Sequence, residues 1–146
     1  MYIDLPTELP YSLRARGLQE TWGFSCTCSL CSASLSERTE SDERRVQFHA
    51  IRRAISRKTY QSYEELLDLT KEWLYVIKTE RLEIKIPDYY RFLMEAYAEA
   101  EDFRRAISYG KKALKFEQAV GDIETQFYED VSKDLRLLEE LRQFSE

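Results

Sequence analysis

Residues 90–114 read YRFLMEAYAEAEDFRRAISYGKKAL, and this stretch decides the fold class. Its apolar side chains recur every three or four positions, which predicts two amphipathic helices joined by a short break. Ala106 and Ala113 are small enough to let the two helices approach closely, and Tyr97 is large enough to fill the gap beside them. We therefore expect an antiparallel pair of closely packed helices in this part of the chain.

A similar periodicity continues on both sides, so that residues 41–146 are expected to be helical almost throughout. The expected helices are Asp42–Lys58, a second that starts at a capping box of Ser62 and Glu65, then Asp88–Ala100, Asp102–Gln118 and Asp122–Phe144. Gly121 is expected to be the glycine cap after the fourth of these helices. Residues 32–43 are polar and without periodicity, which predicts a linker, and a short helix is expected at Tyr11–Trp22. The fold class is therefore mainly α, with a small cysteine-rich segment at 1–40 and an antiparallel helical array at 41–146.

The quoted stretch resembles one unit of a tetratricopeptide repeat. Tyr90, Leu93 and Tyr97 match the large residues of that repeat's first helix, Ala106 and Ala113 match the small residues of its second helix, and Asp102-Phe103 matches the turn. Met94 stands where the pattern has Gly or Ala, Glu101 stands for the turn glycine, and Gly110 stands for an aromatic residue. The resemblance implies a degenerate repeat completed by its neighbours, with a groove for a partner peptide. A helical bundle without a groove is the alternative.

The composition excludes several classes of protein. The chain has 146 residues, of which 43% are hydrophobic and 34% charged, a balance that favours a packed core over disorder. It has no run of about 18 apolar residues and no signal-peptide pattern at its N-terminus, so we expect no membrane span and a protein of the nucleus or cytoplasm. The formal net charge of −5 argues against direct nucleic-acid binding.

Two charged segments are candidate surfaces for a protein partner. The first expected long helix carries a basic cluster, which consists of Arg44, Arg45, Arg52, Arg53, Arg57 and Lys58. The last segment, residues 122–146, contains eight acidic and three basic side chains. The simpler interpretation of both is a solvated helix face. The sequence does not determine the oligomeric state.

All three cysteines lie close together in the C-x-C-x-x-C motif Cys26-Thr-Cys28-Ser-Leu-Cys31. Thiolates at this spacing can converge on one tetrahedral zinc ion, but a structural zinc site has four protein ligands. His49 is the only histidine and lies 18 residues beyond Cys31 on an expected helix, so a water molecule or another protein segment is favoured as the fourth ligand. Three free thiols, or a redox pair of Cys28 and Cys31, are the alternatives.

The residues around the cysteines carry a second resemblance. It rests on Tyr2-Ile3-Asp4, Pro6-Thr7, Arg14, Leu18 and Trp22-Gly23-Phe24-Ser25-Cys26-Thr27-Cys28-Ser29-Leu30-Cys31. This order, followed by helical pairs, resembles the end of a SET domain and its post-SET motif in the SMYD-like protein lysine methyltransferases and their fungal SET-domain relatives. The resemblance is strong over residues 2–31 and loose over residues 42–144.

This resemblance implies roles for five residues. Cys26, Cys28 and Cys31 correspond to three post-SET zinc ligands, whose fourth partner in the family is a cysteine in an Asn-His-Ser-Cys type motif of the SET core. Phe24 corresponds to the aromatic residue against the adenine of S-adenosylmethionine, and Tyr2 corresponds to the tyrosine at the methyl-transfer centre. The Asn-His-Ser-Cys motif and the glycine-rich cofactor segment do not occur in this sequence. We therefore expect the C-terminal portion of a lysine methyltransferase, which does not methylate by itself.

A different class of function is also open. The chain can be a stand-alone helical-repeat module that binds a protein or peptide, with a zinc-binding or vestigial cysteine cluster. In the first hypothesis the helices shape access to a cofactor and substrate pocket, and S-adenosylmethionine binds only in a full-length protein. In the second hypothesis the helices bind a partner and perform no chemistry.

Overall fold

The computed structural model describes residues 8–121 and 124–146, and over these residues the protein is helical. The elements are α1 (Tyr11–Trp22), α2 (Leu35–Arg57), α3 (Tyr63–Thr79), the 3-10 turn η1 (Glu83–Lys85), α4 (Ile86–Glu99), α5 (Phe103–Val120) and α6 (Gln126–Ser145). The mainly α fold class is therefore confirmed. No helix in the described ranges is long and apolar enough to cross a membrane.

Helix α2 begins seven residues before the start that the sequence predicted, at Leu35 instead of Asp42. Ser34 and Glu37 form a capping box, in which the Ser34 hydroxyl accepts from the Glu37 backbone N–H and the Glu37 carboxylate accepts from the Ser34 N–H. The prediction of a linker at 32–43 is thus wrong from residue 35 onward, because this cap starts a helix in a polar stretch that lacks apolar periodicity. The helix continues through the boundary expected between residues 40 and 41.

The later helix boundaries follow capping chemistry. Ser62 caps α3 and Asp102 caps α5, in each case by accepting the backbone N–H three residues on. Gly121 closes α5 in the left-handed conformation (φ 79°), as the sequence predicted. Helix α6 begins at Gln126, after its cap Thr125; the predicted start at Asp122 lies outside the described residues.

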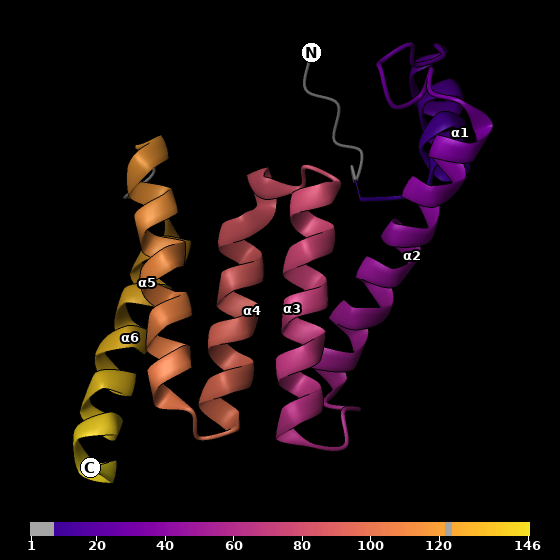
Figure 1. Cartoon of the computed structure of the whole chain (residues 1–146). Coiled ribbons are helices and arrows are strands. Elements are labelled where there is room, and N and C mark those ends of the chain that lie inside the picture. The colour runs from indigo at the N-terminus through magenta and orange to yellow at the C-terminus, as the bar shows by residue number, and fades with distance from the viewer. Residues whose placement is uncertain (1–7, 122–123) are drawn as a thin grey trace.

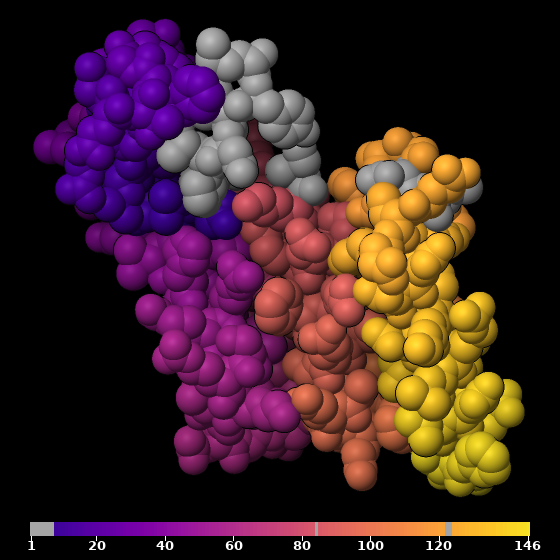
Figure 2. Space-filling view, turned by 180° about the vertical axis from the view of Figure 1, so that it is seen from behind, coloured from indigo at the N-terminus to yellow at the C-terminus, as the bar shows by residue number. Residues whose placement is uncertain are grey.

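The helices form an array in which successive members run in opposite directions (Figure 1). Helices α3 and α4 stand at its centre, α5 and α6 form one flank, and α2 crosses the other flank with α1 beside its N-terminal half. Helix α4 packs mainly on α5, α5 on α6, and α2 contacts both α3 and α4. Figure 2 shows the same order of helices from behind.

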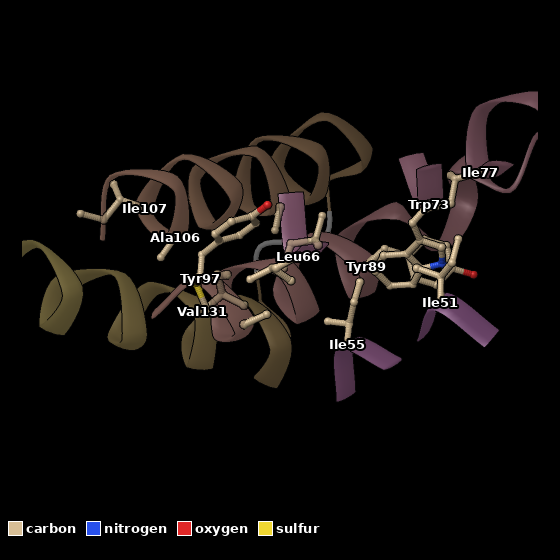
Figure 3. Packing of buried hydrophobic residues seen from close by; sticks show 14 of the residues in the cluster. Ile51, Ile55, Leu66, Trp73, Ile77, Tyr89, Tyr97, Ala106, Ile107 and Val131 are labelled. Atoms are coloured by element: carbon tan, nitrogen blue, oxygen red, sulfur yellow. The ribbon is translucent and has the colours of Figure 1, made fainter. Parts of the chain in front are cut away.

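Aromatic residues from three helices form one half of the core (Figure 3). The ring of Trp73 on α3 lies 5.6 Å from that of Phe48 on α2 and 5.1 Å from that of Tyr89 on α4, measured between centroids. Trp73 and Phe48 are fully buried, and Tyr89 is 3% exposed. Burial of such large apolar surfaces is the main stabilising contribution to this array.

The α4–α5 pair forms the other half of the core. Tyr97, Ala106 and Ala113 are all buried, as expected for helices that approach closely. A Cβ atom on Gly110 would lie 2.7 Å from Met94 Sδ and 2.6 Å from Leu135 Cδ2, so the lack of a side chain at Gly110 leaves room for both neighbours. The large residue at 94 and the small residue at 110 are therefore complementary in size.

A buried polar cluster joins α2 to the end of α3. Glu80, whose side chain is 4% exposed, accepts from Ser41 Oγ at 2.6 Å, from Arg44 Nε at 2.6 Å and from Arg45 Nε at 3.1 Å. Arg45 is itself only 3% exposed. The interpretation of the basic helix as a solvated face is thus wrong for Arg45, because this residue lies on the buried stripe of α2 that also contains Phe48.

Candidate metal site

The cysteine loop is the segment of residues 23–34 between α1 and α2. Gly23 ends α1 with a φ of 70°, a left-handed conformation that favours glycine, and its N–H donates to Gln19 O. Within the loop, the Ser32 N–H donates to Cys28 O at 2.9 Å and the Ser32 hydroxyl donates to Thr27 O at 3.0 Å. These local bonds form compact turns and fold the chain back on itself around the cysteines.

The base of the loop is attached to α2 through α1. The Tyr11 backbone N–H donates to Asp42 Oδ1 at 2.6 Å, and the guanidinium carbon of Arg38 lies 4.4 Å from the centre of the Tyr11 ring. Both contacts hold the start of α1 against the first half of α2. Helix α1 is thereby fixed to α2 at the end of α1 that lies away from the cysteine loop.

The loop gathers all three thiols that the sequence predicted as ligands. The Sγ atoms of Cys26, Cys28 and Cys31 all lie within 4.8 Å of one another, and the three cysteines are free. Cys28 is exposed and the other two are half-buried. Sulfur atoms at the Zn–S distance of about 2.3 Å in a tetrahedron are about 3.8 Å apart, so a small contraction of the cluster suffices for a metal ion.

The thiols have different acidities. The backbone N–H of Cys31 lies 3.5 Å from Cys28 Sγ, and this donor is the largest cause that lowers the pKa of Cys28 to about 7. Burial is the largest cause that raises the pKa of Cys31 to about 11, and its two cysteine neighbours add to the rise. A thiolate is the form that binds a metal ion, and the loop stabilises it first at Cys28.

The remaining predicted site residues do not lie in the cluster. His49 is not part of the group of convergent ligands; its ring lies on α2, with its centroid 5.2 Å from that of Phe48. Phe24 is 39% exposed just after α1. Tyr2, the residue that resembles a methyl-transfer tyrosine, lies outside the described residues. Among the residues that the structure describes, only the three cysteines come together, and no other predicted ligand joins them.

A hollow of about 470 Å³ adjoins the loop and was missed by sequence reasoning. Ser29, Leu30 and Ala33 of the loop form one wall, and the opposite wall includes Glu80 and Arg81 after α3. One indication of a buried ion pair beside this hollow was present in the sequence. Arg45 falls on the same helical stripe as Phe48, where a charged residue needs a buried partner. The partner, Glu80, is 35 residues away and could not be identified by local spacing.

Chemically, the cluster offers three soft sulfur donors on an accessible loop. Such donors select zinc and related soft metal ions over magnesium or calcium.

No known family, no curated protein and no solved structure was found to match this chain.

Proposed function

We propose that residues 23–34 bind a zinc ion through Cys26, Cys28 and Cys31, and that the chain is the C-terminal portion of a SET-type protein lysine methyltransferase. The observation that carries the metal site is the convergence of three Sγ atoms within 4.8 Å. The ion would hold the two ends of a loop that has little apolar burial of its own. Its contribution would be structural.

The donor set fits zinc in type but supplies three of the usual four ligands. Thiolates are the preferred donors for structural zinc, and the exposed side of Cys28 leaves access for a fourth group. His49 is a poor candidate because it is not among the convergent ligands. A water molecule or a cysteine from another protein segment would complete the coordination.

The methyltransferase assignment is supported by the order of residues in the sequence. The motif of Trp22, Phe24 and the three cysteines precedes a helical array, as in the SET-type family that it resembles. Phe24 would contact the adenine of S-adenosylmethionine and Tyr2 would lie at the methyl-transfer centre, in both cases only together with a catalytic core. We expect the isolated chain to be inactive, because the cofactor and substrate segments are not in this sequence.

Zinc titration tests the metal site. The purified chain, reduced and metal-free, is titrated with zinc in competition with a chromogenic chelator, and bound metal is counted by elemental analysis. We expect weak or substoichiometric binding in the wild type, and loss of that binding in Cys26→Ser and Cys28→Ser. A tight one-to-one complex that disappears in His49→Ala would contradict the three-cysteine site.

A radiolabelled methyl-transfer assay tests the expected inactivity. Histones and a cell lysate serve as substrates, and Cys26→Ser is the control. Incorporation clearly above that control would show that this chain has a complete active site. The reading frame upstream of Met1 tests the assignment itself: an in-frame Asn-His-Ser-Cys some tens of residues before Tyr2 would favour it.

A helical-repeat interaction module is the second candidate, and two observations of the α4–α5 pair favour it. Glu101, at the position of the turn glycine, has a φ of 59°, which is the left-handed region that favours glycine. Met94 is larger than the residue of the repeat pattern and Gly110 is smaller, and the two are complementary in size. A functional promoter upstream, with the codon of Met1 as the start codon, would favour this stand-alone module over the methyltransferase portion.

A further inference from the structure

A second hollow, of about 370 Å³, lies on the helical array away from the cysteine loop. Its lining residues come from α2, from η1, from α4 and from the segment before α1: Glu8, Arg52, Lys85, Asp88, Tyr89, Arg91, Phe92 and Glu95. The volume is enough for one side chain or a small organic acid. Since it contains no cysteine, whatever binds there is independent of the proposed metal site.

Tyr89 is a lining residue of this hollow and carries a buried hydroxyl. The residue is 3% exposed, and its hydroxyl has no hydrogen-bond partner among the described residues. Burial, and then the charge of Glu8, raise the pKa of Tyr89, so the group keeps its proton and can donate. A buried donor without an acceptor is costly, and an oxygen of a ligand would satisfy it.

Arg52 contributes a cation. Its guanidinium carbon lies 5.2 Å from the centre of the Phe92 ring, and no ion pair joins it to an acid within residues 8–121 and 124–146. A guanidinium stacked on a ring keeps its edge N–H groups available, and those groups match the two oxygens of a carboxylate. The hollow therefore has two donors without acceptors, one charged and one neutral.

The other charged groups of the hollow restrict the charge of the ligand. Lys85 pairs with Glu8 at 3.2 Å and Arg91 pairs with Glu95 at 3.1 Å, so two of the three cations are neutralised. The third acid, Asp88, is exposed at the start of α4. With three acids and three bases in the lining, a monoanion is accommodated at less electrostatic cost than a phosphate dianion.

We propose that this hollow binds a single carboxylate group through the guanidinium of Arg52 and the hydroxyl of Tyr89. The carboxylate can belong to a Glu or Asp side chain of a peptide or to a small organic acid. Phe92 positions the guanidinium, and the Lys85–Glu8 ion pair forms part of the lining. Neither the zinc ion nor a methyltransferase core is required for this binding.

An NMR titration of the full chain tests the proposal. Four probes are added separately: acetyl-Gly-Glu-Gly-amide, its Gln counterpart, acetate and inorganic phosphate. The Nε–Hε signal of Arg52 and the backbone signals around Tyr89 report binding. We expect the Glu peptide to bind at least about tenfold more tightly than the Gln peptide, and phosphate to bind less tightly than the carboxylates.

Variants identify the two donors. Tyr89→Phe keeps the aromatic core and is expected to weaken Glu-peptide binding about tenfold, and Arg52→Ala is expected to abolish it. Arg53→Ala, which removes an exposed cation one residue along α2, is the matched control and should change nothing. Acetate that binds as tightly as the Glu peptide would support the same site and identify a small acid as its ligand.

Other results would overturn the proposal. These are equal binding of the Glu and Gln peptides, tighter binding of phosphate, an equal loss in the Arg53 variant, unchanged binding in the folded Tyr89→Phe variant, or no response to any probe. Circular dichroism of each variant distinguishes a lost site from a lost fold. Since the zinc titration has a separate readout, failure of one proposal does not affect the other.

Discussion

The cysteine loop and the helical array are held together by different means. In the array, fully buried side chains such as Trp73, Leu93 and Val131 come from different helices and belong to one hydrophobic core. In the loop, Cys28 is exposed, and the chain is held by short-range hydrogen bonds of the Ser32 backbone and side chain. The array is therefore stabilised by burial of its own residues, whereas the loop would gain stability from a metal ion only if the proposed site binds one.

Helix α2 connects the two regions, because it follows the cysteine loop directly and packs into the array. Its second half carries Phe48 and Ile55 into the core, while its first half carries Ser41 and Arg45 to Glu80. The buried polar cluster around Glu80 therefore holds the first half of α2, and the apolar stripe holds the second half. The five predictions below test this division, from the largest expected change in the free energy of unfolding to the smallest.

Trp73→Ala should have the largest effect. Trp73 is fully buried between Phe48 and Tyr89, and its loss would leave a large cavity in the core. We expect the free energy of unfolding to fall by about 4 kcal/mol. Urea denaturation followed by circular dichroism measures it, with a zinc chelator present and absent. A loss below about 1 kcal/mol would show that the aromatic cluster does not stabilise the array.

Glu80→Ala should rank second. It removes the acceptor of three donors, including the carboxylate that pairs with the buried guanidinium of Arg45. We expect a loss of about 3 kcal/mol, because removing one partner of a buried ion pair is strongly destabilising. Glu99→Ala is the matched control, since it breaks the exposed pair with Lys58 and should cost less than about 1 kcal/mol. Similar losses in both variants would contradict a special role for the buried cluster.

Met94→Ala and Gly110→Ala should show coupled effects. Each is expected to destabilise α4–α5 packing alone, the first through a cavity and the second through a Cβ atom 2.7 Å from Met94 Sδ. In the double variant the new methyl group enters space that Met94 vacates, so the combined loss should be smaller than the sum by about 1 kcal/mol. Chemical denaturation of the four proteins in this cycle measures the coupling. Additive losses would contradict size complementarity.

Glu101→Gly should stabilise the protein slightly. Glu101 is exposed with a φ of 59°, a conformation that costs an ordinary residue about 1 kcal/mol relative to glycine. We expect the midpoint of thermal unfolding to rise by a few degrees. Glu101→Ala, which removes the same carboxylate but retains a Cβ atom, should not give this gain. If it does, the cause is charge and not backbone conformation.

Cys28→Ser should have the smallest effect when metal is absent. The side chain is exposed, so we expect the free energy of unfolding, measured in the presence of a chelator, to change by no more than about 0.5 kcal/mol. Added zinc should stabilise the wild type in proportion to its affinity and leave the variant unchanged. A large loss in chelator would mean that the thiol itself holds the loop in place.

Local chemistry explains how far the sequence predicted the fold. The bounds of α1 are as predicted, and the caps Ser62 and Gly121 were predicted correctly because a cap depends on residues three or four positions apart. The start of α2 was not predicted, because the prediction relied on apolar periodicity and that pattern is absent from the first turns of this helix. Its capping box lies in a polar segment, and the apolar periodicity begins only at Phe48, more than three turns later.

The same distinction holds for the candidate site. Three cysteines within six residues must lie near one another in any compact loop, so the sequence alone indicated the cluster. The opposite wall of the hollow beside it, formed after α3, depends on how α2 packs on α3. Spacing along the chain does not determine that arrangement.

The sequence by itself determined the helical class, the small-residue approach of α4 and α5, and the candidate ligands Cys26, Cys28 and Cys31. Only the tertiary structure decided that Arg45 is buried on Glu80 and that Arg52 and Tyr89 share a hollow. Short-range patterns determine helices and turns because their hydrogen bonds join residues a few positions apart. Partners from different helices meet only through packing, where burial selects among many possible pairs.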